Sequence, residues 1–455
     1  MMVEVSVSDA RIDRPGGGVL GRASSTRKPS ARTWRSARVG WCGLVGLLST
    51  GLVIAISAGT TSVLLPPSAQ PIRGSLAGVF GHSGIDLELG GLIAVLALMF
   101  VSYLAAIRGA DQLSPRAVLI GIAGLNAVVL LAPPLLSTDV FSYVAYGRIG
   151  ALYGANPYLH GPNAIALDPA HTFIAARWLA TPTVYGPLFT AMSYVLAPLN
   201  VGLNVLAYKI IAAASSLTIV FVVWKAARVR GVNPVRAVVL VGLNPVIVVF
   251  GVGGGHNDLL MLALLLTGVY VLLRDNGRAS GALIVAATAV KLTAGILLPF
   301  VFAHNARGRG GRGLRAVLTG VGVAAVLGGV LSFVVFGSGP FHLAGTLEKV
   351  QNGGGLNSFS GLLLTSLGLG HLRGPVGSVL QVAFVICVVW LVIRVWKGNL
   401  DWITGAGWAT AALLVTAGLL LPWYVGWLVP LAALSTDRRL AATAVVLTGV
   451  GLTTL

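Results

Sequence analysis

The segment from Leu135 to His160, LLSTDVFSYVAYGRIGALYGANPYLH, holds residue types that suit acid–base chemistry. Because the mostly apolar residues 117–134 come before it, we expect Asp139 at a membrane surface. If the segment is helical, Asp139, Tyr143 and Tyr146 share one face. A carboxylate placed there can act as a general base or hold a polar ligand. The same residues also fit an interfacial loop, with the acid capping a helix and the tyrosines forming an aromatic belt.

A second polar cluster, His256, Asn257 and Asp258, lies in VGGGHNDLL, where a long apolar run begins. A helix cap would explain one of the three polar side chains, because Asn or Asp accepts the free amide protons of a first turn. The remaining two favour contact with a ligand. The three preceding glycines leave backbone amides free to approach a phosphate.

Lys291 interrupts an apolar stretch of more than twenty residues, and no acidic residue lies within ten positions of it. An intramembrane lysine costs roughly 2.5–3.5 kcal/mol on insertion scales and indicates a function. A phosphate near the outer leaflet would be its natural partner. Snorkelling of the ammonium to the surface is the alternative.

Weaker candidates lie in turns and loops. Tyr158 and Tyr185 belong to the turn motifs NPY and YGP. Glu348 and Asn357 belong to the polar, glycine-rich loop 337–375, which is polar enough to bind sugar hydroxyls. An ordinary loop without a binding role explains this segment equally well.

Two further clusters have simpler interpretations. Asp86 and Glu88 could bind a metal, although a solvated loop explains them better. Trp423, Tyr424 and Trp427 fit an interfacial aromatic belt first and a groove for a lipid tail second.

The composition identifies the elements that must position these residues. The chain has 455 residues, of which 56% are hydrophobic and 10% charged. This excludes a soluble domain and predicts an all-α polytopic membrane protein. Cys42 and Cys387 lie in or beside apolar runs, so we expect neither a disulfide framework nor a paired-cysteine zinc site.

The net charge of +18 is distributed as a topology signal. Seven Arg and one Lys lie between Arg11 and Arg38, and most other basic residues fall in short loops. Because no basic stripe alternates with aromatic residues, nucleic acid is not an expected partner. We expect residues 1–39 to form a disordered basic cytoplasmic tail and residues 40–455 to form one transmembrane domain.

Placing the basic loops in the cytoplasm predicts 11 transmembrane helices, or 13 if Lys291 lies in a re-entrant hairpin of two short limbs. The segment 184–199 must then stay on one side. The outward loops become 65–89, 135–183, 253–256 and 337–375, and the candidate chemistry faces outward in a multi-pass protein of the plasma membrane.

These blocks together resemble the C superfamily of integral-membrane glycosyltransferases (GT-C), whose members carry a catalytic Asp in an outward loop. More closely, TDVFSYVAYGRIGALYGANPY, YGPL, GHNDLL and KLTAGILLP are similar to the actinobacterial polyprenol-phosphomannose-dependent α-(1→6)-mannosyltransferases of lipomannan biosynthesis. The resemblance runs from about residue 40 to the end of the chain.

The resemblance implies mannosyl transfer from polyprenyl-phosphate-mannose to a lipid-anchored α-(1→6)-mannan acceptor, with inversion and without a cofactor. Asp139 would be the catalytic base. Tyr158, Tyr185, Glu348 and Asn357 would contact the acceptor or its loops. The residues expected around the donor phosphate and sugar are Lys291, Arg148, His256, Asn257, Asp258, Tyr143 and Tyr146.

No metal is expected, since Asp139 is not part of a D-x-D motif. The alternatives are α-(1→2)-mannosyl or arabinofuranosyl transfer, or transport of a lipid-linked sugar by a flippase. Against the flippase, we find no internal repeat in hydropathy. A structural scaffold would leave Asp139, the GHND block and Lys291 unexplained.

Overall fold

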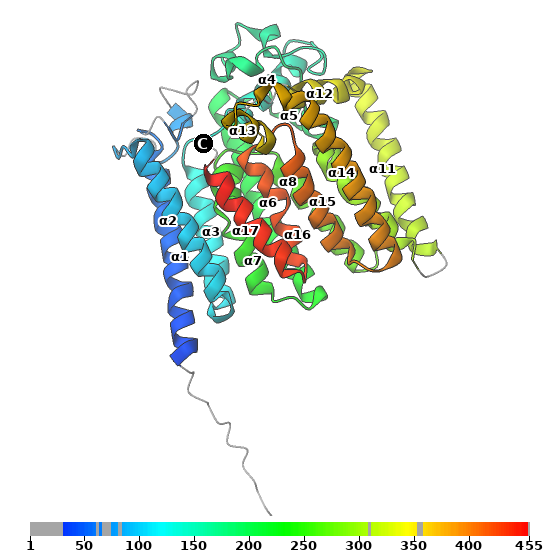
Figure 1. The fold of residues 1–455 in the computed structure, drawn as a ribbon. Helices are drawn as coiled ribbons and strands as arrows, with labels where there is room; N and C mark the ends of the chain where they lie inside the picture. The colour runs from blue at the N-terminus through cyan, green and yellow to red at the C-terminus, as the bar shows by residue number, and fades with distance from the viewer. Residues whose placement is uncertain are drawn as a thin grey trace, which may run out of the picture.

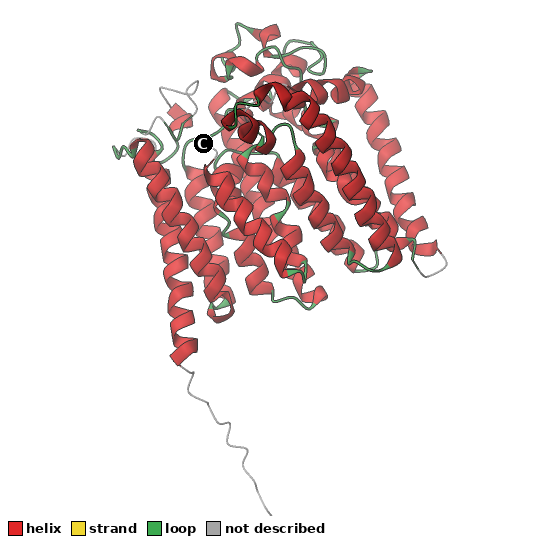
Figure 2. Ribbon diagram, in the orientation of Figure 1, coloured by secondary structure: helices red, strands yellow, loops and turns green. Residues whose placement is uncertain are grey.

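The protein is helical throughout the part that its computed structural model describes, namely residues 31–60, 63–65, 74–80, 84–307, 311–352 and 358–453. Within these ranges the chain forms no β-strand (Figure 2). This confirms the predicted all-α polytopic class. The first helix begins at Ala31, so the last residues of the expected tail are helical, and residues 1–30 lie outside the described part.

The helices are arranged as one bundle, with short helices gathered at one end (Figure 1). Those that run through the bundle are α1 (Ala31–Ser57), α2 (Glu88–Gly109), α3 (Pro115–Leu131), α6 (Val201–Arg230), α7 (Pro234–Gly242), α8 (Asp258–Leu273), α9 (Gly277–Val290), α10 (Leu298–Asn305), α11 (Arg312–Phe336), α14 (Arg373–Lys397), α15 (Trp402–Thr416), α16 (Val429–Leu434) and α17 (Arg438–Thr453). Those at one end are α4 (Asp139–Ala151), α5 (Pro187–Leu196), α12 (Leu343–Asn352) and α13 (Phe359–Ser366). Short irregular helices include η7 (Val246–Val252), η8 (Leu292–Leu297), η10 (Gly339–His342) and η12 (Pro422–Trp427).

Local sequence signals set many of these boundaries. Asn200 begins α6 by accepting a hydrogen bond from the amide of Leu203, and Gly231 ends it with φ of 69°. Asn233 caps α7, and Pro234 occupies its first position, where no amide donor is needed. These positions confine the connection between α6 and α7 to a few residues.

Five helices in the described part are long and apolar enough to cross a membrane alone, or six if α7 and η7, bent by 48°, form one span. The expected count of 11–13 is reached only by including shorter apolar helices. Some of the short helices have a local cause, because the chain breaks at Lys291 and at Pro422, and a 3₁₀ helix follows each break.

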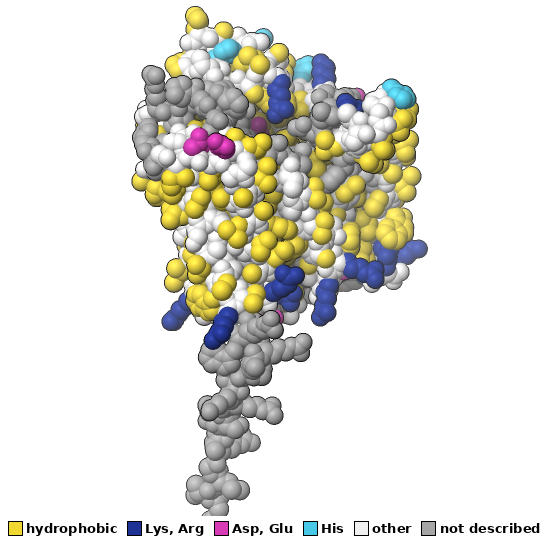
Figure 3. All heavy atoms as spheres, turned by 60° about the vertical axis from the view of Figure 1, so that its left-hand side comes forward, with side chains coloured by type: hydrophobic (Ala, Val, Ile, Leu, Met, Phe, Trp, Pro, Cys, Tyr) yellow, Lys and Arg dark blue, Asp and Glu magenta, His cyan; other side chains and the backbone are white. Residues whose placement is uncertain are grey.

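The basic loops lie together at the lower end of the bundle in Figure 1. Arg230 forms an ion pair with Asp401 at 2.9 Å, and Asn233 donates a hydrogen bond to Asp111. On the face drawn in Figure 3, a broad hydrophobic band lies above an edge of Lys and Arg side chains. The segregation of basic loops to one end agrees with the charge pattern of the sequence, while the membrane side that each end faces stays a prediction.

Two segments lie in the bundle as the charge pattern predicts, while their placement in a membrane stays a prediction. The helix α5 stays at the upper end, where the amide of Gly186 donates to the carbonyl of Val290. The limbs α9 and α10 form a hairpin: Gly277 packs against Val317, Arg307 reaches the carbonyl of Val395, and Lys291 lies at the opposite, upper turn.

Candidate functional site

Asp139 is presented by a non-helical segment that is fastened to its neighbours at several points. Lys209, buried in α6, donates hydrogen bonds to the carbonyls of Ala132 and Pro133 just after α3. The amide of Leu135 donates to the carbonyl of Gly253 at 3.1 Å. The chain then begins α4 at Asp139, whose side chain is 19% exposed. These bonds join the Asp139 segment to the glycine-rich segment before His256.

The GHND block is held by a break in the preceding span. The buried side chain of Asn244 accepts hydrogen bonds from the amides of Val246 and Ile247 and donates to Tyr103 and Thr448. The π-helical turns of η7 follow, and the glycines deliver His256 beside Asp139, with Nδ1 at 3.7 Å from Oδ2. A break of this kind is common at functional sites.

Lys291 and Asp258 form the central ion pair of the site, with Nζ at 2.7 Å from Oδ1. The expected partner of this cation was a ligand, and the sequence offered no acid nearby; the structure supplies one from 33 positions earlier. The same Oδ1 accepts a hydrogen bond from the indole of Trp427 at 2.6 Å. The ammonium also lies over the rings of Tyr424 and Trp427, at 4.6 and 5.2 Å from their centroids.

A cavity of about 260 Å³ opens between these groups, with Asp139 and Lys291 both in its wall. The rest of the lining combines aromatic, polar and apolar side chains. The aromatic and polar ones include Ser142, Tyr146, Trp178, Thr181, Tyr185, Gln351, Gln381, Thr416, Tyr424 and Trp427, and the apolar ones include Leu347, Val350, Phe384, Leu413, Leu414, Leu419 and Leu421. The cavity therefore offers both charged and apolar surface to an amphiphilic ligand.

The predicted tyrosines gather beside the cavity in different ways. Tyr146 and Tyr185 line it, and the Tyr146 hydroxyl donates to the carbonyl of Thr181 at 2.9 Å. Tyr143 is buried and its hydroxyl lies 3.4 Å from both His256 Nδ1 and Asn257 Oδ1. Tyr158 is buried farther away and donates to the carbonyl of Tyr185. Neither Tyr143 nor Tyr158 lines the cavity, so both support its shape from behind the wall.

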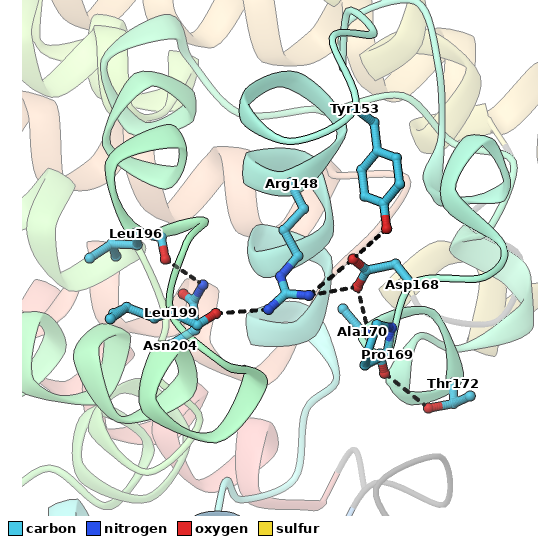
Figure 4. Close-up of polar contacts among 9 residues, drawn as sticks. All are labelled: Arg148, Tyr153, Asp168, Pro169, Ala170, Thr172, Leu196, Leu199 and Asn204. Atoms are coloured by element: carbon cyan, nitrogen blue, oxygen red, sulfur yellow. Dashed lines mark hydrogen bonds and ion pairs between the residues drawn. The ribbon is translucent and has the colours of Figure 1, made fainter.

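Arg148 does not reach the cavity. Its guanidinium donates two hydrogen bonds to the buried carboxylate of Asp168, at 2.9 and 3.0 Å, and another to the carbonyl of Leu199 (Figure 4). The hydroxyl of Tyr153 binds the same carboxylate. This arrangement ties α4 to the segment 162–178 and to the start of α6, and it leaves the guanidinium engaged with protein atoms.

The two loop candidates do not help to define the site. Glu348 is exposed on α12 and does not line the cavity, whereas its neighbours Leu347, Val350 and Gln351 do. Asn357 lies outside the described residues.

The surroundings of Asp139 shift the pKa of its carboxyl. The residue begins α4, outside the spanning helices, and burial raises the pKa of its carboxyl to about 6, while Lys291 opposes the rise. Burial lowers the pKa of His256 to about 3, so its imidazole is neutral near neutral pH. A carboxyl with a pKa close to the working pH is suited to accept a proton and release it again.

Several site residues could not be identified from sequence alone. The cluster of Trp423, Tyr424 and Trp427 was expected in an interfacial belt first and in a groove for a lipid tail second. Trp423 and Trp427 are both 7% exposed, Trp427 lines the cavity, and Trp423 stacks on His256 with centroids 3.9 Å apart. Trp178, Thr181 and Gln351 had no signal apart from their place in predicted outward loops. For the tryptophans, the helix-breaking Pro422 directly before the cluster was an available signal.

The fold and the site define a polytopic helical membrane protein with an amphipathic cavity that contains a carboxylate and an ammonium. A model of the family described as Alpha-(1->6)-mannopyranosyltransferase, N-terminal domain, matches residues 41–307, and one described as MptB C-terminal domain matches residues 354–454. Because the first match covers more than half of the chain, the protein belongs to this family.

Curated relatives agree with this membership. Alpha-(1->6)-mannopyranosyltransferase A of Corynebacterium glutamicum is 31% identical over 229 residues, covering 46% of this chain and 46% of the relative. The protein of that name from Mycobacterium tuberculosis is 31% identical over 268 residues, 54% of this chain and 49% of the relative. Alpha-(1->6)-mannopyranosyltransferase B of C. glutamicum is 28% identical over 323 residues, which cover 64% of this chain and 52% of the relative. The matched part of the chain spans about half the length of these relatives, and no solved structure matches it.

Proposed function

We propose that this protein transfers mannose from polyprenyl-phosphate-mannose to an α-(1→6)-linked mannan acceptor at the outer face of the plasma membrane. The observation that carries the proposal is that one cavity has both Asp139 and Lys291 in its wall, together with many leucines. A polyprenyl phosphate has the matching shape, with an anionic head on a long apolar chain. Family membership and the names of the relatives add the sugar and the linkage.

In the proposed reaction, Asp139 accepts the proton of an acceptor hydroxyl as its oxygen attacks the anomeric carbon. The bond from that carbon to the phosphate oxygen breaks, and the electron pair leaves with the polyprenyl phosphate. Attack from the opposite face converts a β-linked donor into an α-linked product. Because the phosphate is a good leaving group, we propose that no cofactor is required.

Lys291 would stabilise the departing phosphate, whose negative charge grows as the bond breaks. Asp258 and the aromatic rings of Tyr424 and Trp427 hold the ammonium in place before the donor arrives. Such preorganisation is more effective in a poorly solvated cavity than in water.

The test is to incubate the purified protein in detergent with radiolabelled polyprenyl-phosphate-mannose and an α-(1→6)-dimannoside. We expect a labelled trimannoside whose new linkage an α-(1→6)-specific mannosidase removes, and no product with Asp139→Asn. A product of another linkage would overturn the specificity. No product, together with movement of the labelled lipid across vesicles, would favour a flippase.

A further inference from the structure

A second cavity, here called the α12 groove, lies on the other side of α12 from Asp139. Its volume is about 360 Å³. His342, Thr346 and Lys349 line it from the helical side, and Tyr158 and Pro182 line it from the loop after α4. Nothing in the reaction proposed above uses this groove.

The helix α12 divides the two cavities by its periodicity. His342, Thr346 and Lys349 follow at intervals of four and three residues and so project from one face. Leu347 and Val350 lie on the other face and line the Asp139 cavity. One helix therefore forms a wall of both spaces.

The loop after α4 likewise separates the Asp139 cavity from the α12 groove. Thr181 and Val184 line the Asp139 cavity, whereas Pro182 between them lines the groove. The amide of Thr183 donates to the carbonyl of Pro157 at 2.8 Å, which fixes this wall. The Asp139 cavity and the groove therefore share two walls, α12 and this loop.

The chemistry of the groove suits a saccharide. The side chains of His342 and Lys349 are exposed and form no hydrogen bond or ion pair with other described residues, so both can bind hydroxyl groups. Leu159 and Phe341, the latter 81% exposed, provide apolar surface for the C–H faces of sugar rings. The groove lies at the upper end of the bundle, away from the basic loops (Figure 1).

We propose that the α12 groove binds the saccharide units of the acceptor that lie beyond the two units nearest to Asp139. The inference rests on the proposed function, and it assigns this enzyme a preference for acceptors longer than a disaccharide. The terminal hydroxyl would lie at Asp139, and the earlier units would extend past Thr181 and Pro182 to Lys349.

Gly345 offers a way to fill the groove without disturbing the fold. It lines the groove within α12, and a Cβ atom added there meets no atom within 4 Å. Gly345→Leu should therefore preserve or strengthen the helix, because Leu is a better helix former than Gly. Gly374→Leu is the matched control: that position in α14 is equally open and lies outside the groove. Lys349→Gln removes the ammonium alone.

The experiment compares kcat/KM for α-(1→6)-linked di- and tetramannosides. We expect the wild type to prefer the tetramannoside, and Gly345→Leu and Lys349→Gln to lose roughly tenfold with it, the equivalent of one or two hydrogen bonds. The dimannoside rate and the Gly374→Leu variant should be unaffected. An equal loss with both acceptors, or a wild type without preference for length, would overturn the proposal.

A direct binding measurement separates this proposal from the proposed function. If no transfer is seen with any acceptor, the proposed function fails. Saturation-transfer NMR with the tetramannoside then tests, independently of catalysis, whether the groove binds the saccharide. Signals with the wild type that are lost with Gly345→Leu and retained with Gly374→Leu would support the groove. Equal signals, or none with the wild type, would reject it.

Discussion

Lys291 and Asp258 meet at 2.7 Å across the turn between α9 and α10 and the start of α8, in surroundings that leave their side chains 13% and 3% exposed. The ion pair links the break after α9 to the break before α8, and Lys291 lies in the cavity wall. It also means that the donor phosphate would approach a cation whose charge is already balanced.

We predict that Lys291→Met destabilises the protein by roughly 3–5 kcal/mol, because it leaves Asp258 buried without its counter-charge. The sequence alone gives no reason to expect this loss, because no acidic residue lies within ten positions of Lys291. The double variant Lys291→Met/Asp258→Asn should regain much of the loss. Thermal unfolding in detergent measures both, with Lys225→Met on α6 as a control that lies outside the site.

In the folded double variant, we expect donor affinity to fall by roughly tenfold or more, since a charge-assisted contact to phosphate is lost. Acceptor affinity should stay close to that of the wild type. Unchanged donor binding would leave Lys291 with a structural role only.

A separate prediction concerns the base. Asp139→Asn should reduce transfer by about 10²–10⁴-fold, because an amide cannot accept the acceptor proton. Folding should be preserved, since the Asp139 side chain is 19% exposed and its carboxylate forms no hydrogen bond with other described residues, with His256 Nδ1 at 3.7 Å from Oδ2. The measurement is single-turnover transfer with saturating donor, alongside thermal unfolding. Turnover close to wild type would remove Asp139 from the mechanism.

Much of the site could be located from the sequence because hydropathy and charge determine which loops share an end of the bundle. Asp139, the GHND block and Lys291 were each expected at the same end, and the structure places them around one cavity or directly beside it. The re-entrant position of Lys291 also followed from the requirement that the basic loops around it stay on one side.

Which side chains contact one another at that end of the bundle could not be predicted from the sequence. Hydropathy does not indicate which loops at that end contact one another, so neither Asp258 as the partner of Lys291 nor the stacking of Trp423 on His256 could be assigned. Arg148 was assigned to phosphate by residue type, because Asp168, 20 positions away in an irregular loop, could not be placed beside it.

The topology itself can be tested with single cysteines in a background lacking Cys42 and Cys387. Leu167, 99% exposed at the site end, and Arg236, exposed at the basic end, are suitable positions. We expect Leu167→Cys to react with an impermeant thiol reagent added outside intact cells, and Arg236→Cys to react only after permeabilisation. The reverse pattern would place the cavity in the cytoplasm.

The ion pair of Arg148 and Asp168 should act by positioning. We predict that Arg148→Met and Asp168→Asn lower stability and raise the KM for the donor by similar factors, because each releases α4 from the loop that supplies Trp178 and Thr181. If Arg148 instead bound phosphate, only its own variants would weaken donor binding. Equilibrium binding of the donor lipid to both variants, measured below their unfolding temperatures, distinguishes the two roles.

The final prediction concerns pH. Since Asp139 must be unprotonated to act as a base, kcat/KM should rise with pH through about 6 and level off above it. The groups that face this carboxyl are Lys291 and Arg177, which lower its pKa, Asp258, which raises it, and His256, which is neutral in this range. The tyrosines beside it stay protonated, because burial raises the pKa of Tyr143 and Tyr146.

Arg177 provides the discriminating variant because it is exposed at the outer loop and forms no ion pair with described residues, resting instead over the ring of Trp178. Removing its charge in Arg177→Gln takes away one cause that lowers the pKa of Asp139, so the acid limb of the profile should move to higher pH. Arg236→Gln removes the same charge at the opposite end and should leave the limb in place. A limb that is flat from about pH 5 to about pH 8, or one that moves equally in both variants, would show that another group controls the reaction.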